Sequence, residues 1–136
     1  MIKLLLAVLV LAFVAFGVYF KWVFSESLYF DKASLKYRLL VADAIKQAPV
    51  YGENPRYHYT AGDGSRPGGS SVFFSTSDTR DEILERYRDY YSKRGGEVVE
   101  ESSGLRIEMP RGGNELRLNI RDNGHKRDVE IMRFRR

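Results

Sequence analysis

The sequence LRIEMPRGGNELRLNIRDNGHKRDVEIMRF, residues 105–134, decides the fold. Apolar and polar residues alternate in three runs that are separated by turn signals. The runs are 105–109, 115–121 and 128–131. The second turn signal, Asn123-Gly124, is typical of a tight hairpin because asparagine and glycine tolerate positive φ. Strict alternation gives each strand one dry face and one wet face, so the stretch predicts an antiparallel meander.

The sequence also predicts a helix upstream of this stretch, which supplies a cover for the dry face. Residues 78–94 carry an apolar stripe at helical spacing, and Asp78 is placed to cap the first turn. The stripe consists of Ile83, Leu84, Tyr87, Tyr90 and Tyr91. Gly95-Gly96 ends the helix, and residues 97–101 are one more strand of the meander. A meander packed on one helix is an α+β two-layer sandwich.

Two further strands are expected before this helix. Residues 56–60 and 71–76 favour strands, and the glycine-rich residues 62–69 between them indicate a long turn. We therefore expect a hairpin with a wide loop. These glycines do not indicate a phosphate site, because the loop lacks the lysine of a phosphate-binding loop and does not lead from a strand into a helix.

The chain begins with an apolar segment. Residues 4–20 are 17 positions without a charge, which in a helix cover roughly 26 Å. The hydrocarbon core of a bilayer is about 30 Å thick, and Lys21 can extend its ammonium to the headgroups while more apolar residues follow. We therefore predict a membrane anchor over residues 1–24. The anchoring residues are Leu4, Leu5, Leu6, Phe13, Phe16, Tyr19, Phe20 and Trp22.

A cleaved signal peptide is the alternative for this segment. Lys3 supplies a positive start, and Ala15-Phe16-Gly17 resembles a cleavage site. The apolar run continues through that site, which favours an uncleaved span. A short N-terminus with one lysine places the domain outside the cytoplasm, whereas Lys32, Lys36 and Arg38 beyond the span argue for the opposite orientation. We predict a single-pass protein of a bacterial inner membrane with a periplasmic domain.

A connector follows the anchor over residues 25–48. Its apolar residues recur at helical spacing, which predicts one helix that Pro49 ends. The stripe consists of Leu28, Leu35, Leu39, Ala42 and Ile45. It packs either on the protein's own sheet, within the domain of residues 49–136, or on a partner or second copy.

Part of the chain resembles a pattern found in uncharacterised small bacterial lipoproteins and membrane-anchored domains. The pattern here is Pro49-Val50-Tyr51, then Thr76-Ser77-Asp78, Tyr87-Arg88 and Gly95-Gly96, within residues 48–100. The chain departs from it at Glu97, where an aromatic residue is frequent, and in having no lipidated cysteine. The resemblance implies an extracytoplasmic α+β domain and transfers no catalytic residues.

Few residues indicate chemistry. The chain has no cysteine, which excludes disulfides, thiolate catalysis and thiolate metal sites. Its two histidines, His58 and His125, lack neighbours at metal-ligand spacing, and no G-x-S-x-G elbow is present. The net charge of +4 is too mild for a nucleic-acid binder. We therefore expect no enzyme activity, no metal and no cofactor.

These observations favour a non-enzymatic accessory subunit that is anchored in the lipid bilayer and docks on a larger membrane protein complex. The alternative is a tethered module for an anionic ligand such as a glycan or lipid headgroup, and a homo-oligomer remains open. The expected contact residues are Leu28, Leu35, Leu39, Arg117, Arg121, Arg133 and Arg135.

Overall fold

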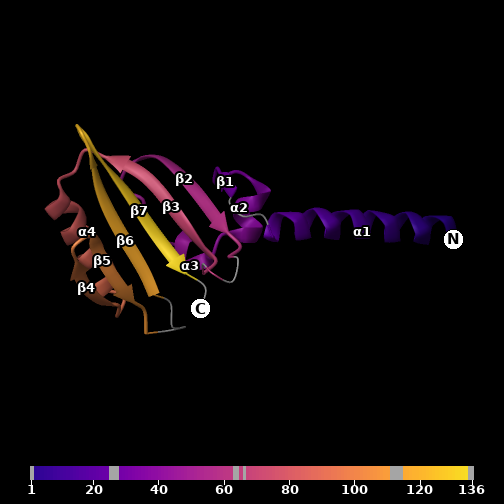
Figure 1. Ribbon diagram of the computed structural model, residues 1–136. Coiled ribbons are helices and arrows are strands. Elements are labelled where there is room, and N and C mark those ends of the chain that lie inside the picture. Colours follow the sequence, from indigo (N-terminus) through magenta and orange to yellow (C-terminus); the bar gives the residue numbers. More distant parts are fainter. Residues whose placement is uncertain (1, 25–27, 63–64, 66, 111–114, 135–136) are drawn as a thin grey trace.

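One long helix, α1 (Ile2–Val23), opens the chain in the computed structural model. The structure describes residues 2–24, 28–62, 65, 67–110 and 115–134. In Figure 1, α1 projects from the domain with its N-terminus farthest away. Its stretch Leu4–Val23 has a mean hydropathy of 2.4, and none of it is buried against the protein. The prediction of an N-terminal helix long and apolar enough to cross a membrane is therefore confirmed.

The single helix predicted over residues 25–48 is wrong. Within the described part of this segment lie an edge strand, β1 (Leu28–Phe30), and two short helices, α2 (Leu35–Leu40) and α3 (Asp43–Lys46). Strand β1 pairs in antiparallel register with Tyr57–Tyr59, so its backbone bonds are made to another strand. Periodic leucines cannot reveal such pairing with a distant segment.

A buried serine accounts for the break between α2 and α3. Val41 and Ala42 have extended backbones, with ψ of 130° and 142°. The Ala42 amide donates to the Oγ of Ser70 over 3.2 Å, and that hydroxyl donates to the Leu40 carbonyl over 3.5 Å. Because the serine satisfies both backbone groups where the helix stops, the chain can turn there at little cost.

The expected hairpin and helix follow. Strands β2 (Glu53–Thr60) and β3 (Gly69–Thr76) pair in antiparallel register, with an irregularity near the start of β2. Helix α4 (Arg80–Ser92) comes next and ends close to the predicted glycine pair. The hairpin and the helix are therefore confirmed.

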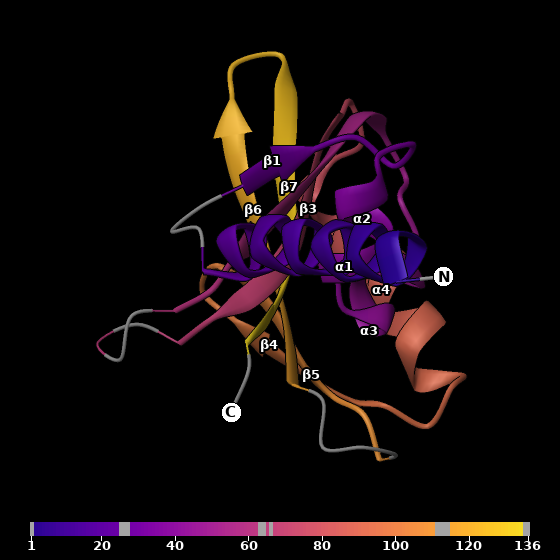
Figure 2. The ribbon, with the colours of Figure 1, turned by 90° about the vertical axis from the view of Figure 1, so that its right-hand side faces the viewer.

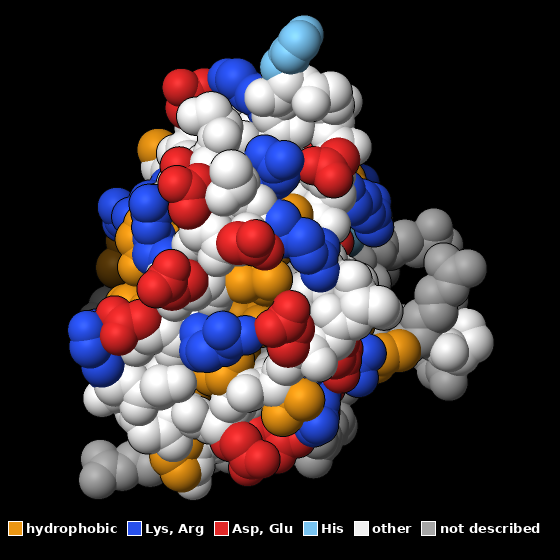
Figure 3. All heavy atoms as spheres, turned by 90° about the vertical axis from the view of Figure 1, so that its left-hand side faces the viewer, with side chains coloured by type: hydrophobic (Ala, Val, Ile, Leu, Met, Phe, Trp, Pro, Cys, Tyr) orange, Lys and Arg blue, Asp and Glu red, His pale blue; other side chains and the backbone are white. Residues whose placement is uncertain are grey.

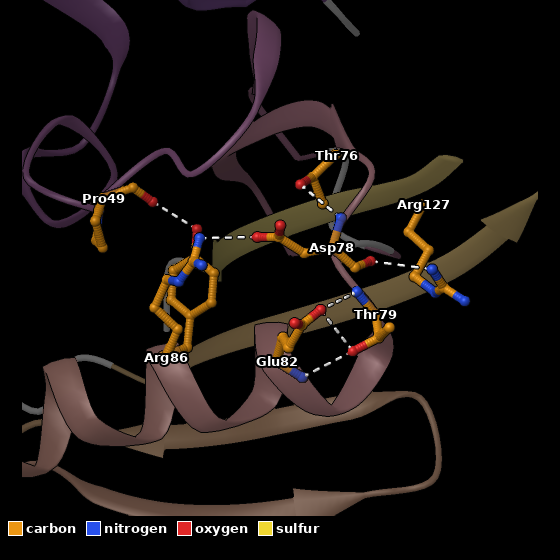
Figure 4. Close-up of polar contacts among 8 residues, drawn as sticks. Pro49, Thr76, Asp78, Thr79, Glu82, Arg86 and Arg127 are labelled. Carbon is orange, nitrogen blue, oxygen red and sulfur yellow. Dashed lines mark hydrogen bonds and ion pairs between the residues drawn. The ribbon is translucent and has the colours of Figure 1, made fainter. Parts of the chain in front are cut away.

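The cap of α4 differs from the prediction by one residue (Figure 4). Thr79, rather than Asp78, is the N-cap, because its Oγ1 accepts the Glu82 amide over 3.3 Å. The Glu82 carboxylate in turn accepts the Thr79 amide over 2.7 Å, which completes a capping box. Asp78 instead pairs with Arg86 over 2.8 Å.

The predicted meander is confirmed. It consists of β4 (Glu97–Glu101), β5 (Gly104–Glu108), β6 (Glu115–Asn123) and β7 (Lys126–Phe134). Gly104 begins β5 with φ of +157°, and a Cβ there would lie 1.9 Å from the Leu118 carbonyl oxygen. Glycine is therefore required at the closest approach of β5 to β6.

All seven strands form one antiparallel sheet in the order β1-β2-β3-β7-β6-β5-β4. The crossover through α4 carries the chain from β3 to the far edge, and the meander returns to place β7 beside β3. Helices α2, α3 and α4 lie on the same side of the sheet (Figure 2). The α+β architecture is confirmed, although α4 shares the cover of the sheet with the two short helices.

The core lies between the sheet and these helices. From the helices it receives Ile45, Ile83, Leu84 and Tyr87, and from the strands alternate residues that are almost fully buried. The strand residues include Tyr57, Val72, Ile107, Leu118, Val129 and Ile131. The opposite face of the sheet carries no helix among the described residues.

Candidate functional site

The uncovered side of the sheet, which we call the open face, is the candidate site. It faces the viewer in Figure 1. One cross-strand row runs from Tyr29 through His58, Ser71 and Met132 to Arg117. The next row contains Arg56, Phe73, Glu130 and Asn119. Segments far apart in the sequence thus meet on one surface.

Three rings gather at the β1 end of this face. The Tyr29 ring stacks on the His58 imidazole with centroids 4.4 Å apart, and Phe73 lies 6.3 Å from the same imidazole. Tyr29 nevertheless keeps 65% of its surface exposed. Burial lowers the pKa of His58 from its ordinary value, so the neutral imidazole is favoured there.

A carboxylate lies next to this cluster. Glu130 pairs across the sheet with Phe73 on one side and Asn119 on the other, and it is half-buried. Burial raises the pKa of its carboxyl group, while the nearby Arg121 acts in the opposite direction. Glu130 occupies a polar position in the alternating pattern of the last strand, which predicts an exposed side chain, and no pattern in the sequence indicates its partial burial.

Two hollows open on this face. One, of about 380 Å³, is lined by His58, Thr60, Ser71, Glu130 and Met132 among others. The other, of about 460 Å³, is lined by Tyr29, Arg56, Phe73, Arg121 and Asp128 among others. The surface of the first hollow is mostly apolar with a few polar groups, as in ligand-binding pockets, whereas polar and charged side chains make up most of the lining of the second.

The structure does not bring the predicted basic contact residues together. Arg117 and Arg121 lie on the open face, but Arg133 pairs with the buried Ser70 and Leu116 and therefore has the parity of the covered face. Arg135 lies outside the described residues. The Arg133 backbone position therefore belongs to the opposite side of the sheet from Arg117 and Arg121, because successive residues of a strand alternate between the two faces.

Acidic partners offset two arginines of the open face. Arg117 Nε lies 2.9 Å from a carboxylate oxygen of Glu115. Arg106 forms ion pairs with Glu101, over 3.2 Å, and with Glu108. Figure 3 views the end of the domain away from α1, at a right angle to Figure 1, and shows charges of both signs interspersed there as well.

The predicted leucine stripe of the connector is divided. Leu35 and Leu39 on α2 are 58% and 50% exposed, whereas Ile45 on α3 is fully buried. The backbone of Leu28 lies in the edge strand, and its side chain is outside the described part of the chain. Residues that form one stripe in the sequence are therefore buried in the core on α3 and exposed on α2.

Two contacts connect the domain to the end of α1. The hydroxyl of the buried Tyr59 donates to the Val23 carbonyl over 2.9 Å. The Lys36 ammonium lies 5.1 Å from the centre of the Trp22 ring, which is a cation–π distance. These contacts hold the sheet close to the end of the apolar helix, and no pattern in the sequence indicates them.

The polar residues around the start of α4 have structural partners. Arg127 donates to the Asp78 carbonyl over 3.0 Å, and the Tyr87 hydroxyl donates to the Pro49 carbonyl over 2.6 Å (Figure 4). Within the residues that the structure describes, no group of three or more histidine and acidic side chains is placed to hold a metal ion.

Comparison of the chain with family models, with curated proteins and with solved structures found no match.

Proposed function

We propose that this chain is a non-enzymatic, single-pass membrane protein whose domain docks on a larger membrane protein complex through the open face. In this proposal α1 stays uncleaved in a bacterial inner membrane, and the domain lies on the extracytoplasmic side. The partner is a protein rather than a free ligand, and the domain contributes a binding surface to the complex.

The open face carries the proposal. Its centre contains the half-buried Glu130 and Phe73, and the exposed ring of Tyr29 lies at its β1 edge, with no helix above them among the described residues. Aromatic and methionine side chains are enriched in protein interfaces, and polar side chains commonly surround them. A sheet face that served only to contact water would not need this arrangement.

The contacts at the end of α1 support the membrane setting. Tyr59 is 1% exposed and binds the Val23 carbonyl, so the fold uses the last turn of α1 as a structural partner. In the proposal α1 is an uncleaved anchor, and this contact at its last turn holds the sheet beside the bilayer.

The anionic-ligand alternative receives less support. Arg106 and Arg117 already pair with carboxylates of their own face, and an incoming anion would have to displace those partners. Exposed ion pairs of this kind contribute little energy, but they cancel the field that would attract an anion.

Photo-crosslinking in intact membranes tests the proposal. A photoreactive residue is placed at Arg117 or Arg121 of the open face, and as a control at Glu85, which is exposed on α4. We expect both open-face positions to yield one adduct of the same size, and the control to yield none. Equal adducts from all three positions, or only uncrosslinked monomer, would contradict docking through this face.

The anchor is tested separately. Washing the membranes with alkaline carbonate should leave the full-length chain in the pellet, and its N-terminus should be intact by mass spectrometry. Release of the full-length chain, or a chain that begins after residue 17, would exclude the tether.

A further inference from the structure

Helix α2 has two opposed sides. Tyr37 and Leu40 are buried in the core, at 8% and 5% exposure. Leu35 and Leu39 are one helical turn apart, on the side opposite to these two residues, because each residue advances the helix by about 100°. Both leucines point away from the domain and expose half or more of their surface. No described residue of the chain covers this pair.

The place of α2 in the molecule indicates what covers the pair. In Figure 1, α2 lies on the side of the domain from which α1 projects. The Lys36–Trp22 contact joins the two helices at that point, over 5.1 Å. Since lipid surrounds α1 in the proposed function, the exposed side of α2 is at the depth where lipid begins.

The charges around α2 also fit a membrane surface. Lys32 and Arg38 are exposed next to the two leucines, and Lys36 lies between them and the aromatic end of α1. Apolar side chains next to lysine and arginine are the pattern of segments that lie in the headgroup region. A basic segment beside a span also favours anionic lipids.

We propose that α2 is a second membrane contact, in which Leu35 and Leu39 enter the boundary between lipid headgroups and acyl chains. The inference rests on the proposed function, because it requires α1 to span the bilayer. Attachment at two places, α1 and α2, restricts the rotation of the domain about the axis of α1. The open face is then presented to partners in one orientation.

The lack of cysteine makes the chain well suited to a spin-label test. Single cysteines replace Leu35 or Leu39, and the matched control is Glu85→Cys on the exposed side of α4. A third label, Phe13→Cys, reports whether α1 is inserted. The full chain is reconstituted in vesicles of phosphatidylcholine and phosphatidylglycerol, and each label is measured for collision with oxygen and with a water-soluble nickel complex.

The expected result is a ratio of oxygen to nickel collisions that is several-fold higher at positions 35 and 39 than at position 85. Position 13 should give the highest ratio. A lipid-like value at 13 with water-like values at 35 and 39 would overturn the α2 contact and leave the span intact. A water-like value at 13 would overturn the span itself.

A second copy of the chain is the competing occupant, and the same labels separate it from lipid. If two copies covered the leucines, both reagents would be excluded and labels at position 39 would broaden each other's spectra. That outcome would overturn the lipid contact. The variant Leu39→Ser, with the label at 35, should lower the ratio at 35 several-fold, whereas Glu85→Ser should not change it.

Discussion

The two faces of the sheet are built from the same strands and differ in almost every property. On β6, Leu118 is fully buried beneath the helices, while its neighbour Arg117 is exposed on the open face. The covered face is apolar throughout its centre, whereas the open face mixes rings, carboxylates and arginines. The difference indicates that folding energy comes from one face, which leaves the other available for binding.

The largest test of this comparison is a pair of adjacent substitutions. Leu118→Ala should lower the free energy of unfolding by about 2–5 kcal/mol, because it removes buried methyl groups and leaves a cavity. Arg117→Ala removes only an exposed ion pair with Glu115, and should change the free energy of unfolding by less than about 1 kcal/mol. Urea unfolding in mild detergent, followed by the circular dichroism of the tyrosines, measures both.

A similar loss from both substitutions would break the comparison, since it would mean that the open face also contributes to the core. In that case the role assigned to the open face in docking would lose its basis.

The second test concerns how the helical layer is attached to the sheet. Thr79→Ala removes the capping box of α4 and should cost about 1 kcal/mol of unfolding free energy. Asp78→Ala removes the ion pair with Arg86, which is partly exposed, and should cost less. The same urea titration ranks the two variants. If Asp78→Ala were the more damaging, the cap predicted from the sequence would be right after all.

The sequence predicted the elements whose cause is local. Alternation over residues 105–134 predicted the meander, and the uncharged run at the N-terminus predicted α1. It failed where a distant residue decides the structure. Ser70 binds the backbone where α2 ends, and β1 pairs with β2. Neither interaction can be read from the spacing of the leucines.

The candidate site was predicted less well than the fold, for the same reason. Alternation along one strand puts Arg117 and Arg121 on the same side of the sheet, and in the structure both lie on the open face. The centre of the open face depends on the pairing of β3 with β7, which brings Phe73 beside Glu130. No sequence signal connects these two strands, because α4 and strands β4, β5 and β6 lie between them in the chain.

A third test separates two buried tyrosines of the helical layer. The Tyr87 hydroxyl donates to the Pro49 carbonyl, and Tyr87→Phe should cost about 1 kcal/mol because it leaves that carbonyl without the bond. The Tyr91 hydroxyl is buried without a hydrogen-bond partner among the described residues. Tyr91→Phe should therefore be neutral or slightly stabilising.

Thermal unfolding of the two phenylalanine variants, side by side, measures this difference. Burial raises the pKa of both tyrosines well above the ordinary value, so both stay protonated over the working range and pH does not confuse the comparison. A larger loss of stability for Tyr91→Phe than for Tyr87→Phe would show that the Tyr91 hydroxyl, rather than the bond from Tyr87 to Pro49, stabilises the helical layer.

The smallest effect expected is a pH dependence that originates on the open face. Because burial raises the pKa of Glu130 above its ordinary value of 4.5, the protonated form favours the fold. The protonated Glu130 carboxyl group contributes its full stability at pH values below the pKa that Glu130 has in the unfolded chain. This contribution is lost as the pH rises through the higher pKa that Glu130 has in the folded chain. Glu130→Gln should therefore remove this loss and leave the domain at least as stable as the original at pH above that window.

The difference in unfolding free energy between Glu130→Gln and the original chain, followed across the acid range, isolates this group from Arg121 and His58. The exposed Glu85→Gln on α4 is the control and should show no such trend. At neutral pH the partly buried, charged Glu130 lowers the stability of the free domain. A docked partner with a positive or hydrogen-bonding group could relieve that loss. If Glu130→Gln instead destabilised the domain at neutral pH, the carboxylate would belong to the fold, and the open face would lose its strongest sign of a binding role.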